Sequence, residues 1–463
     1  MAFWTYQNIA DVTQGTWLVE PEDLGAEVTG LWHDTREIKE GQAYLAIQGD
    51  NFDGHDFIDK AFDAGAALAI VSTDPPSLEG GVGGRVPSQP VLQVDDTVVT
   101  LQDLARAYRD ELKAGGCKVI GIAGSNGKTT TRHLIHHVLT HAGLEGTQSP
   151  KSFNNHLGVP LTLLSAKPEH DFVACEIGTN HPGEIDFLAA IVRPDIAVIT
   201  SIGEEHLEFF KDLEGVAKEE LSIISHIQPG GDVVVGPMQF WISKVRQLAE
   251  NGAFGLSLYS EPDNEPPKDS HLLGEHNQQN AAITGVVARL VGAKFPDWYE
   301  ALRAVKPPPH RCVPMAFGSS VTVIDDCYNA NPTSMIAALH VLEQHSPGTR
   351  RVGILGDMFE LGSQADEAHR RVGAYAQGIP IMLDQLIAIG GYAQSMVDAF
   401  IPAKGIQEAI AFPEWTDDLP NQVAELLQPG DTVLLKASRG MRLERLIPAI
   451  ERRFGPAQGN EPT

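Results

Sequence analysis

The chain has 463 residues, of which 42% are hydrophobic and 21% are charged, a balance typical of a folded protein with two or three domains. Its 34 Lys and Arg residues stand against 61 Asp and Glu residues, which gives a formal net charge of -27. Because such a surface repels phosphate backbones and anionic lipids, nucleic acids and membranes are disfavoured as partners. A single nucleotide can still bind, since a local nest of backbone N–H groups with one lysine overcomes a distant field.

The cysteines and the start of the chain indicate a reducing compartment. The chain begins MAFWTYQNIADVTQG, which lacks the basic start and apolar run of a signal peptide, and no later run is long enough to span a bilayer. We therefore expect a cytoplasmic protein without membrane insertion, and a monomer. No Cys-x-x-Cys pair suggests a zinc knuckle or a disulfide framework, because the four cysteines are far apart: Cys117, Cys175, Cys312 and Cys327.

The first part of the chain predicts a small α/β domain. Residues 44–49 are extended in pattern, 55–66 have helical periodicity and 67–72 form an apolar strand candidate. The segment 75–90 is rich in Gly, Pro and Ser and is typical of an exposed loop inside the domain. We place this first domain at residues 1–110.

From Cys117 onward the pattern predicts a doubly wound α/β domain at residues 111–309. A strand at 118–123, a Gly-rich turn and a helix are followed by further strand candidates at 171–178, 195–202 and 232–236. The stiff segment 306–309, Lys-Pro-Pro-Pro, excludes a helix and suits an interdomain connector.

Strands and helices alternate again in the rest of the chain, which predicts a Rossmann-like third domain at residues 310–463. A helix is predicted at 334–345. The strand candidates lie at 321–326, 351–357, 385–391 and 431–437. The expected fold is thus α/β throughout, with a small first domain, a central P-loop ATPase domain and a Rossmann-like third domain.

The strongest chemical signal is a glycine-rich turn between the strand at 118–123 and the helix after it. Glycines allow backbone N–H groups to approach phosphate oxygens, Lys128 would reach the β and γ phosphates, and the Thr129 hydroxyl would bind Mg²⁺. The strict P-loop pattern has Gly where this chain has Ile122, so a plain Gly-rich turn with an exposed lysine is the alternative. The proposed ATP-binding turn is Gly124, Ser125, Asn126, Gly127, Lys128, Thr129 and Thr130.

The run GIAGSNGKTTT resembles the phosphate loop of the Mur ligase and folylpolyglutamate synthase superfamily, in which this spacing is the rule. Further motifs are similar to Mur ligase segments: EIGTNHPGEI, KSFNNHLGVPLTLL, VIDDCYNANPTSM and LGDMFELG. The resemblance runs from about Asp34 to about Leu446, and several of its motifs are not shared with folylpolyglutamate synthases. It implies an ATP- and Mg²⁺-dependent ligase that joins D-alanyl-D-alanine to UDP-N-acetylmuramoyl-tripeptide through an acyl phosphate.

The resemblance also implies metal ligands in the central domain. Glu176, which as a lone strand-end residue would more often be solvated, is matched to a carboxylate that holds Mg²⁺ opposite Thr129. His206 is matched to a ligand of a second Mg²⁺. Mur ligases typically carry a carbamylated lysine fourteen positions after this histidine, where this chain has Glu220, and Lys218 would point elsewhere on a helix. Our hypothesis is that Glu220 supplies the negative charge directly; a weakened enzyme is the alternative.

Nucleotide contacts are implied further along the chain. Asn277 and Asn280 lie in a segment similar to the Gly-x-His-Asn-x-x-Asn-Ala-Ala element that reads adenine, although helix capping alone could explain them. Arg311 is matched to an arginine that reaches ATP phosphates across the domain boundary. Asp326 is matched to an acidic nucleotide contact, and Cys327 stands where the family motif has Ser.

Acceptor and dipeptide contacts are implied by the same motifs. Asn154 and Asn155 belong to the stretch that faces the acceptor and the γ phosphate, with loop stabilisation as the alternative. Asn329 and Asn331 are candidates for positioning the incoming dipeptide.

Two cations near the end of the chain, Lys436 and Arg439, could pair with the dipeptide carboxylate or could be ordinary surface charges.

In the first domain, Asp34-Thr35-Arg36 resembles part of the UDP-sugar-binding motif. Thr35 and Arg36 are therefore candidates for binding the UDP-linked acceptor, and an internal ion pair between Arg36 and Asp34 is an equal alternative. Two rival functions stay open at this point. One is another amino-acid-adding or peptide-adding ligase of the same type, and the other is a nucleotide-binding scaffold whose metal site has decayed at Glu220.

Overall fold

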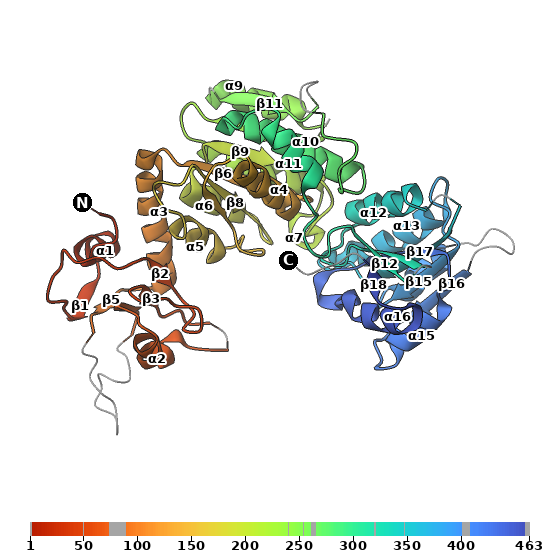
Figure 1. Ribbon diagram of the computed structural model, residues 1–463, viewed down its shortest axis with the longest axis horizontal. Helices are drawn as coiled ribbons and strands as arrows, with labels where there is room; N and C mark the ends of the chain where they lie inside the picture. Colours follow the sequence, from red (N-terminus) through yellow and green to blue (C-terminus); the bar gives the residue numbers. More distant parts are fainter. Residues whose placement is uncertain are drawn as a thin grey trace.

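The computed structural model describes residues 2–49, 51–73, 89–238, 240–252, 254–260, 265–318, 321–346, 348–400 and 408–458. Three α/β lobes follow one another along its longest axis, each around a sheet of its own (Figure 1). The loop predicted at 75–90 lies outside the described residues apart from its last two positions. Within the described parts of the chain, no helix is both long and apolar enough to cross a membrane.

The first lobe is a five-stranded sheet in the order β1-β5-β4-β3-β2, parallel except for β1. The extended, helical and strand segments predicted within it are confirmed, because each predicted span contains an element of that type. Its elements are α1 (Tyr6–Thr13), β1 (Thr16–Val19), β2 (Leu31–Trp32), β3 (Ala43–Leu45), η1 (Gly54–Phe57), α2 (Ile58–Asp63), β4 (Leu68–Val71) and β5 (Val91–Gln93).

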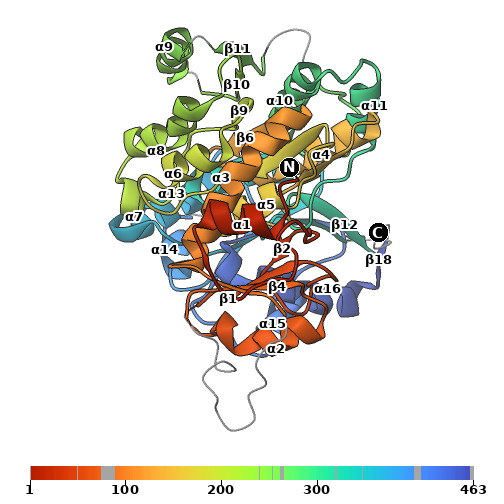
Figure 2. The ribbon, with the colours of Figure 1, turned by 90° about the vertical axis from the view of Figure 1, so that its left-hand side faces the viewer.

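Helix α3 (Thr97–Gly115) links the first lobe to the central one (Figure 2). It begins where the Asp96 side chain accepts hydrogen bonds from two backbone N–H groups, and it ends at Gly116 in the left-handed region, as C-caps commonly do. Its buried Arg109 donates to Asp195 at 2.8 Å and to the Val192 carbonyl at 2.9 Å. The proposed boundary between residues 110 and 111 falls inside this helix.

The central lobe is a fully parallel six-stranded sheet in the order β11-β10-β9-β6-β8-β7. Helices cover both faces, so its strands are continuous apolar runs, as expected for a buried parallel sheet. Its elements are β6 (Lys118–Ala123), α4 (Lys128–His141), β7 (Gly146–Gln148), α5 (Gly158–Leu164), β8 (Phe172–Glu176), α6 (Glu184–Val192), β9 (Ile196–Ile199), α7 (Leu207–Phe210), α8 (Leu213–Glu220), η2 (Leu221–His226), β10 (Asp232–Val235), α9 (Ile242–Gly252), β11 (Gly255–Leu258), α10 (Glu275–Val291) and α11 (Asp297–Ala304).

Alternate residues of the central strands pack into two separate hydrophobic cores, one on each face of the sheet. On one face, Val119 and Val173 pack with α3, α5 and α6. On the other face, Ile120, Ile122 and Val198 pack with α4, α10 and α11. Ile122 is fully buried, so the residue that breaks the strict P-loop pattern contributes to the core beneath the loop.

The third lobe is a seven-stranded sheet in the order β16-β15-β14-β17-β13-β12-β18, parallel from β16 to β13 with two antiparallel strands at its edge. It confirms the Rossmann-like expectation. Its elements are β12 (Val313–Phe317), β13 (Val321–Asp325), α12 (Pro332–Gln344), β14 (Arg350–Gly356), η4 (Gly362–Gln364), α13 (Ala365–Gln377), β15 (Gln385–Ile389), α14 (Ala393–Ala399), β16 (Glu408–Phe412), α15 (Leu419–Leu426), β17 (Asp431–Lys436), η5 (Arg439–Met441), η6 (Leu443–Leu446), α16 (Ile447–Phe454) and β18 (Ala457–Gln458).

The central topology determines where a site can form. Strand β6 lies between β8 and β9, so the segments that follow these three strands meet at one edge of the sheet. Ligands of open α/β sheets bind at such an edge, outside the carboxyl ends of the strands. The third lobe closes over this edge, because Asn331 Nδ2 donates to Asn126 Oδ1 at 2.9 Å and the Tyr328 hydroxyl lies 2.6 Å from Ser152 Oγ.

Candidate active site

The glycine-rich turn between β6 and α4 has the geometry of a phosphate-binding loop. Gly124 and Gly127 have φ values of 122° and 90°, which side chains rarely adopt. A Cβ at Gly124 would collide with Thr200 Oγ1, and one at Gly127 would lie 2.5 Å from Asn280 Oδ1. The open N-terminus of α4 therefore faces the cavity, an arrangement that favours an anion.

Two hydroxyl groups hold the loop in this shape. Ser125 Oγ accepts from the Gly203 N–H at 2.9 Å, and Thr200 Oγ1 donates to the Asn126 carbonyl at 2.6 Å. Both partners follow β9, the neighbouring strand. Hydrogen bonds to residues that follow β9 therefore hold the loop in its conformation.

Lys128 lies at the centre of a group of carboxylates. Its Nζ donates to the Gly124 carbonyl at 2.5 Å and is 3.7 Å from Glu205 Oε2. Burial alone lowers the pKa of this amine, but Glu205, Glu220 and Glu176 outweigh burial, so the pKa is raised. The lysine stays cationic, as phosphate binding requires.

Glu176, at the end of β8, faces the first turn of α4. Its Oε1 accepts from Thr129 Oγ1 at 3.2 Å and from Asn154 Nδ2 at 2.9 Å, while Arg132 Nε lies 3.3 Å from its Oε2. The side chain is 1% exposed. A buried carboxylate beside a hydroxyl is a fitting oxygen pair for a divalent cation.

His206 and Glu205 follow β9 on the other side of the loop. His206 Nδ1 is 2.7 Å from Glu360 Oε2 of the third lobe, and the hydrogen bond from His206 lowers the pKa of that carboxyl. Glu205 is 6% exposed and lines the cavity. Its Oε1 has no hydrogen-bond partner among the described residues, so a polar group at the cavity wall is left for a ligand.

Glu220 lies behind the phosphate loop rather than at the cavity wall. It is fully buried, and its Oε2 accepts the Gly124 N–H at 2.5 Å. Burial and the neighbouring Glu205 raise its pKa well above the usual value for Glu. In this position Glu220 contacts the loop backbone directly, and its role as a metal ligand stays a prediction.

The third lobe contributes cations to the opposite wall. Arg311 Nη2 donates to Thr129 Oγ1 at 3.3 Å, and its guanidinium lies 4.2 Å from the centroid of the Tyr328 ring, a stacking geometry favourable to Arg. The buried Lys436 donates to Asp326 Oδ2 at 2.6 Å and to the Asn329 carbonyl at 3.0 Å. Lys436 is therefore a cation inside the site and not a surface charge.

Asn277 and Asn280 lie in the first turns of α10 and are both buried. Asn277 Nδ2 donates to the Leu273 carbonyl at 2.9 Å, and Asn280 Nδ2 donates to Asn277 Oδ1 at 3.3 Å. Both residues line the cavity. Their present bonds hold the start of the helix, so adenine recognition stays a prediction.

Several of the predicted acceptor and dipeptide residues have structural partners, among them Asn155, Asn331 and Arg439. Asn155 Oδ1 accepts the Leu157 and Gly158 N–H groups at the start of α5, which is the loop-stabilising alternative. Asn331 forms a capping box at α12. Arg439 pairs with Glu444 at 2.8 Å and stays half exposed.

One cavity of about 940 Å³ lies between the central and third lobes. Most of the predicted site residues line it: Ser125, Asn126, Gly127, Lys128, Thr129, Thr130, Asn154, Asn155, Glu176, His206, Asn277, Asn280, Arg311, Asp326, Asn329 and Arg439. Three predicted residues do not line the cavity. Gly124 is part of the phosphate loop, and Glu220 and Asn331 form hydrogen bonds to the loop.

The first-lobe candidates lie elsewhere. Among the described residues, none before Ser125 lines the cavity, so Thr35 and Arg36 are not brought to it. Arg36 pairs with Asp34 at 2.6 Å and its side chain is 86% exposed, which matches the ion-pair alternative. The hydrogen bond from Arg36 lowers the pKa of Asp34 to about 2.

Sequence reasoning missed Glu205, Glu360, Arg132 and Tyr328. The doublet Glu204-Glu205, beside His206 and shortly after the buried strand β9, is the signal that could have identified Glu205. The pairing of Glu360 with His206 joins two domains that are far apart in sequence, and no local pattern reports such a contact.

Comparisons with known proteins agree with this geometry. Family models match all three lobes: "Mur ligase family, catalytic domain" at residues 27–109, "Mur ligase middle domain" at 122–266 and "Mur ligase, glutamate ligase domain" at 310–439. The UDP-N-acetylmuramoyl-tripeptide--D-alanyl-D-alanine ligase of Bacillus subtilis is 32% identical, over 96% of this chain and 97% of that protein.

Solved structures give the same result. A crystal structure of MurF from Acinetobacter baumannii superposes with a TM-score of 0.82 at 29% identity and covers 97% of this chain and 99% of that one. The MurF ligase of Thermotoga maritima in complex with ADP has a TM-score of 0.74 at 25% identity, over 92% of this chain and 97% of that one. The chain therefore belongs to the Mur ligase family.

Proposed function

We propose that this chain is an ATP-dependent ligase that joins D-alanyl-D-alanine to UDP-N-acetylmuramoyl-tripeptide, a step of peptidoglycan precursor synthesis. The observation that carries the proposal is the convergence, in one cavity, of the phosphate loop with Lys128, the Thr129 and Glu176 pair, and the third-lobe cations Arg311 and Lys436. Relatives that are 31–32% identical over nearly their whole length carry this activity in their names.

The chemistry follows from what these groups can stabilise. The tripeptide carboxylate attacks the γ phosphorus of ATP, which forms an acyl phosphate and releases ADP. The dipeptide amine then attacks the acyl carbon, and the tetrahedral intermediate collapses to an amide and phosphate, with the amine proton lost to solvent. Lys128 and the N-terminus of α4 hold the phosphates, and Arg311 adds a cation from the facing lobe. Closure of the lobes around ATP would keep water from the acyl phosphate.

The donor set fits Mg²⁺. Thr129 Oγ1 and Glu176 Oε1 lie 3.2 Å apart beside the phosphate loop, and Glu205 offers an unpartnered carboxylate oxygen near His206. A bound magnesium would offset the negative charge that builds on the phosphates. We assign Thr129 and Glu176 to one ion and His206 with the Glu205 and Glu220 carboxylates to the second.

Burial and Glu205 raise the pKa of Glu220, and a bound Mg²⁺ would favour its ionised form. With the metal in place, Glu205 and Glu220 would together supply the negative charge that related enzymes obtain by lysine carbamylation. Ligation should therefore be independent of added CO₂. A strong CO₂ requirement in a degassed buffer would contradict this assignment, because it would reveal a carbamylated lysine.

The identity of the amine is tested by product mass. The purified chain is incubated with ATP, Mg²⁺ and UDP-N-acetylmuramoyl-tripeptide, and D-alanyl-D-alanine is compared with single D- and L-amino acids. We expect product only with the dipeptide. Product with a different amine alone would favour another ligase of the family, and nucleotide binding without any product would favour a scaffold.

Two further assignments accompany this function. ATP is an intracellular cosubstrate, so we place the reaction in the cytoplasm. We also propose that the chain acts as a monomer, because the cavity is completed by lobes of one chain. Light scattering coupled to size exclusion checks the second point, and a dimer mass at micromolar concentration would contradict it.

A further inference from the structure

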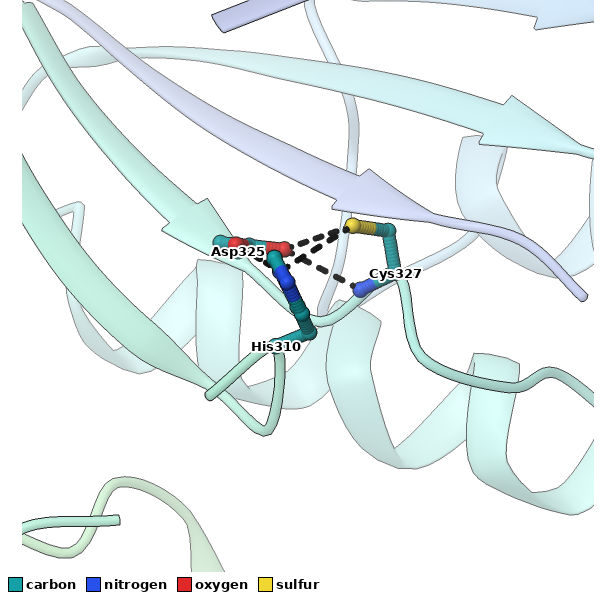
Figure 3. A group of neighbouring side chains, drawn as sticks. All are labelled: His310, Asp325 and Cys327. Carbon is teal, nitrogen blue, oxygen red and sulfur yellow. Dashed lines mark hydrogen bonds and ion pairs between the residues drawn. The ribbon is translucent and has the colours of Figure 1, made fainter. Parts of the chain in front are cut away.

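Three side chains with different donor atoms meet beside the connector between the central and third lobes: His310, Asp325 and Cys327 (Figure 3). His310 follows the proline segment 306–309, and Asp325 ends β13. His310 Nδ1 lies 2.7 Å from Asp325 Oδ2, while Cys327 Sγ lies 2.7 Å from Asp325 Oδ1 and 3.8 Å from His310 Nδ1. None of the three lines the cavity described above, so the cluster is separate from the proposed nucleotide site.

We propose that His310, Asp325 and Cys327 form a binding site for a thiophilic divalent cation of the zinc class. Imidazole nitrogen, thiolate sulfur and carboxylate oxygen together are the donors that zinc takes in proteins, whereas Mg²⁺ takes oxygen. The candidate ligand atoms all lie within 4.8 Å of one another. This inference does not depend on the proposed ligase activity.

Glu444 lies beside the three ligands, next to Cys327. Its Oε2 is 3.7 Å from Cys327 Sγ, and its other oxygen is held by Arg439 at 2.8 Å. With metal–ligand bonds of roughly 2.0–2.3 Å, the edges of a tetrahedron measure about 3.5 Å. The sulfur-to-nitrogen and sulfur-to-Glu444 distances are already close to that length. The two 2.7 Å contacts to Asp325 would lengthen, because a metal replaces the hydrogens that now bridge them.

Metal binding at this cluster exchanges protons for a cation. The Cys327 thiol loses its proton to solvent, and the protonated His310 ring loses the proton on Nδ1 and keeps the one on Nε2. Metal–sulfur and metal–nitrogen bonds form in place of the two bonds to hydrogen. Burial, together with Asp325, raises the pKa of the Cys327 thiol, and the hydrogen bond to Asp325 raises the pKa of His310. Because metal binding displaces these protons, metal affinity should increase as the pH rises.

The surroundings provide an entry path and fixed ligands. The His310 side chain is 31% exposed, so a cation can reach the cluster from solvent, whereas Asp325 is buried. The Cys327 N–H donates to Asp325 Oδ1 at 3.2 Å, and the His310 carbonyl accepts from the Tyr328 N–H at 3.3 Å. Two ligands are thereby positioned by the backbone before a metal binds, as functional metal sites require.

The test is a Co²⁺ titration of the full-length, metal-free protein, because cobalt bound to a thiolate gives a charge-transfer absorption. We expect one equivalent to produce this band, Zn²⁺ to abolish it, and roughly millimolar Mg²⁺ to leave it unchanged. Cys327→Ser should remove the band, and His310→Gln should weaken Co²⁺ binding at least tenfold, of the order seen when metal sites lose supporting groups. Thermal unfolding checks that both variants are folded.

Cys312→Ser is the matched control, because Cys312 is the other buried cysteine near the connector and its Sγ lies 3.6 Å from His276 Nε2. The band should survive in this variant. The proposal is overturned if the parent shows no band, if Cys327→Ser keeps it, or if Cys312→Ser loses it, since the last result would place the thiolate at His276.

Discussion

A cationic side chain has opposite surroundings in two regions of the molecule: it is buried at the carboxyl edge of the central sheet and exposed in the turn at residues 34–36 of the first lobe. The Lys128 side chain is 14% exposed and lies among Glu205, Glu220 and Glu176. The Arg36 side chain is 86% exposed and pairs with Asp34. Burial with several partners fixes a charge in place before a ligand arrives, and that preorganisation is what transition-state stabilisation needs. An exposed pair contributes little by itself and reorganises easily. Lys128 is thus suited to chemistry, whereas the binding role of Arg36 stays a prediction.

The largest expected effect is at the centre of the buried cluster. Lys128→Ala removes the cation that faces the phosphates, so kcat/KM should fall by roughly 10³-fold. Coupled measurement of ADP release checks this. Lys118→Ala, at the exposed start of the same strand β6, is the matched control and should stay within twofold of the parent.

Arg311 and Arg36 allow a direct test of the difference between the buried site and the exposed turn. Arg311→Ala removes a cation that contacts Thr129, so kcat should drop by about 10²-fold. Arg36→Ala tests the prediction that Arg36 binds the UDP-linked acceptor. It should raise only the KM for that acceptor, by up to about tenfold, because a contact remote from the reacting groups is the same in ground and transition states. Steady-state kinetics with the acceptor varied separates the two. A fall in kcat for Arg36→Ala would contradict the division between binding and chemistry.

A smaller effect is expected at the contact between the lobes. Asn331→Ser keeps the cap of α12 but removes the amide donor to Asn126, so kcat should fall several-fold with nearly unchanged stability. Asn331→Ala removes the cap as well and should lower the free energy of unfolding by about 1 kcal/mol. Urea unfolding and kinetics on both variants measure these effects. Equal kinetics for parent and Asn331→Ser would show that the contact is incidental.

The smallest effect is a pH dependence in the third lobe. His369 is fully buried, its Nδ1–H donates to the Ala365 carbonyl at 2.6 Å, and its Nε2 accepts the Met358 N–H at 2.9 Å. Burial lowers its pKa below the ordinary 6.5. The unfolded chain therefore binds the proton more readily, and stability is lost as the pH falls below 6.5.

Urea unfolding between about pH 7.5 and 5 measures this dependence. His369→Gln should show a shallower loss of stability, by at most about 1.4 kcal/mol per pH unit. An unchanged slope would mean that other groups carry the acid sensitivity.

The sequence predicted the central and third folds well, because buried parallel strands are continuous apolar runs between Gly-rich turns and helices. It also predicted the phosphate loop, whose glycines and lysine lie together in one short segment. It could not assign Asn155 and Asn331, since an Asn beside a helix start caps the helix or binds a ligand with the same atoms. It could not place Glu220 behind Gly124, because a contact across 96 residues depends on how α8 packs with its neighbours α6 and α7 in the central lobe.

We propose that the cavity between the central and third lobes couples the conversion of ATP to ADP to amide formation. This coupling is tested most directly by ADP release from the parent protein with each peptide substrate omitted in turn. We expect sustained ADP release with UDP-N-acetylmuramoyl-tripeptide and D-alanyl-D-alanine together, and almost none with either alone. ADP release at the same rate without the tripeptide would contradict it.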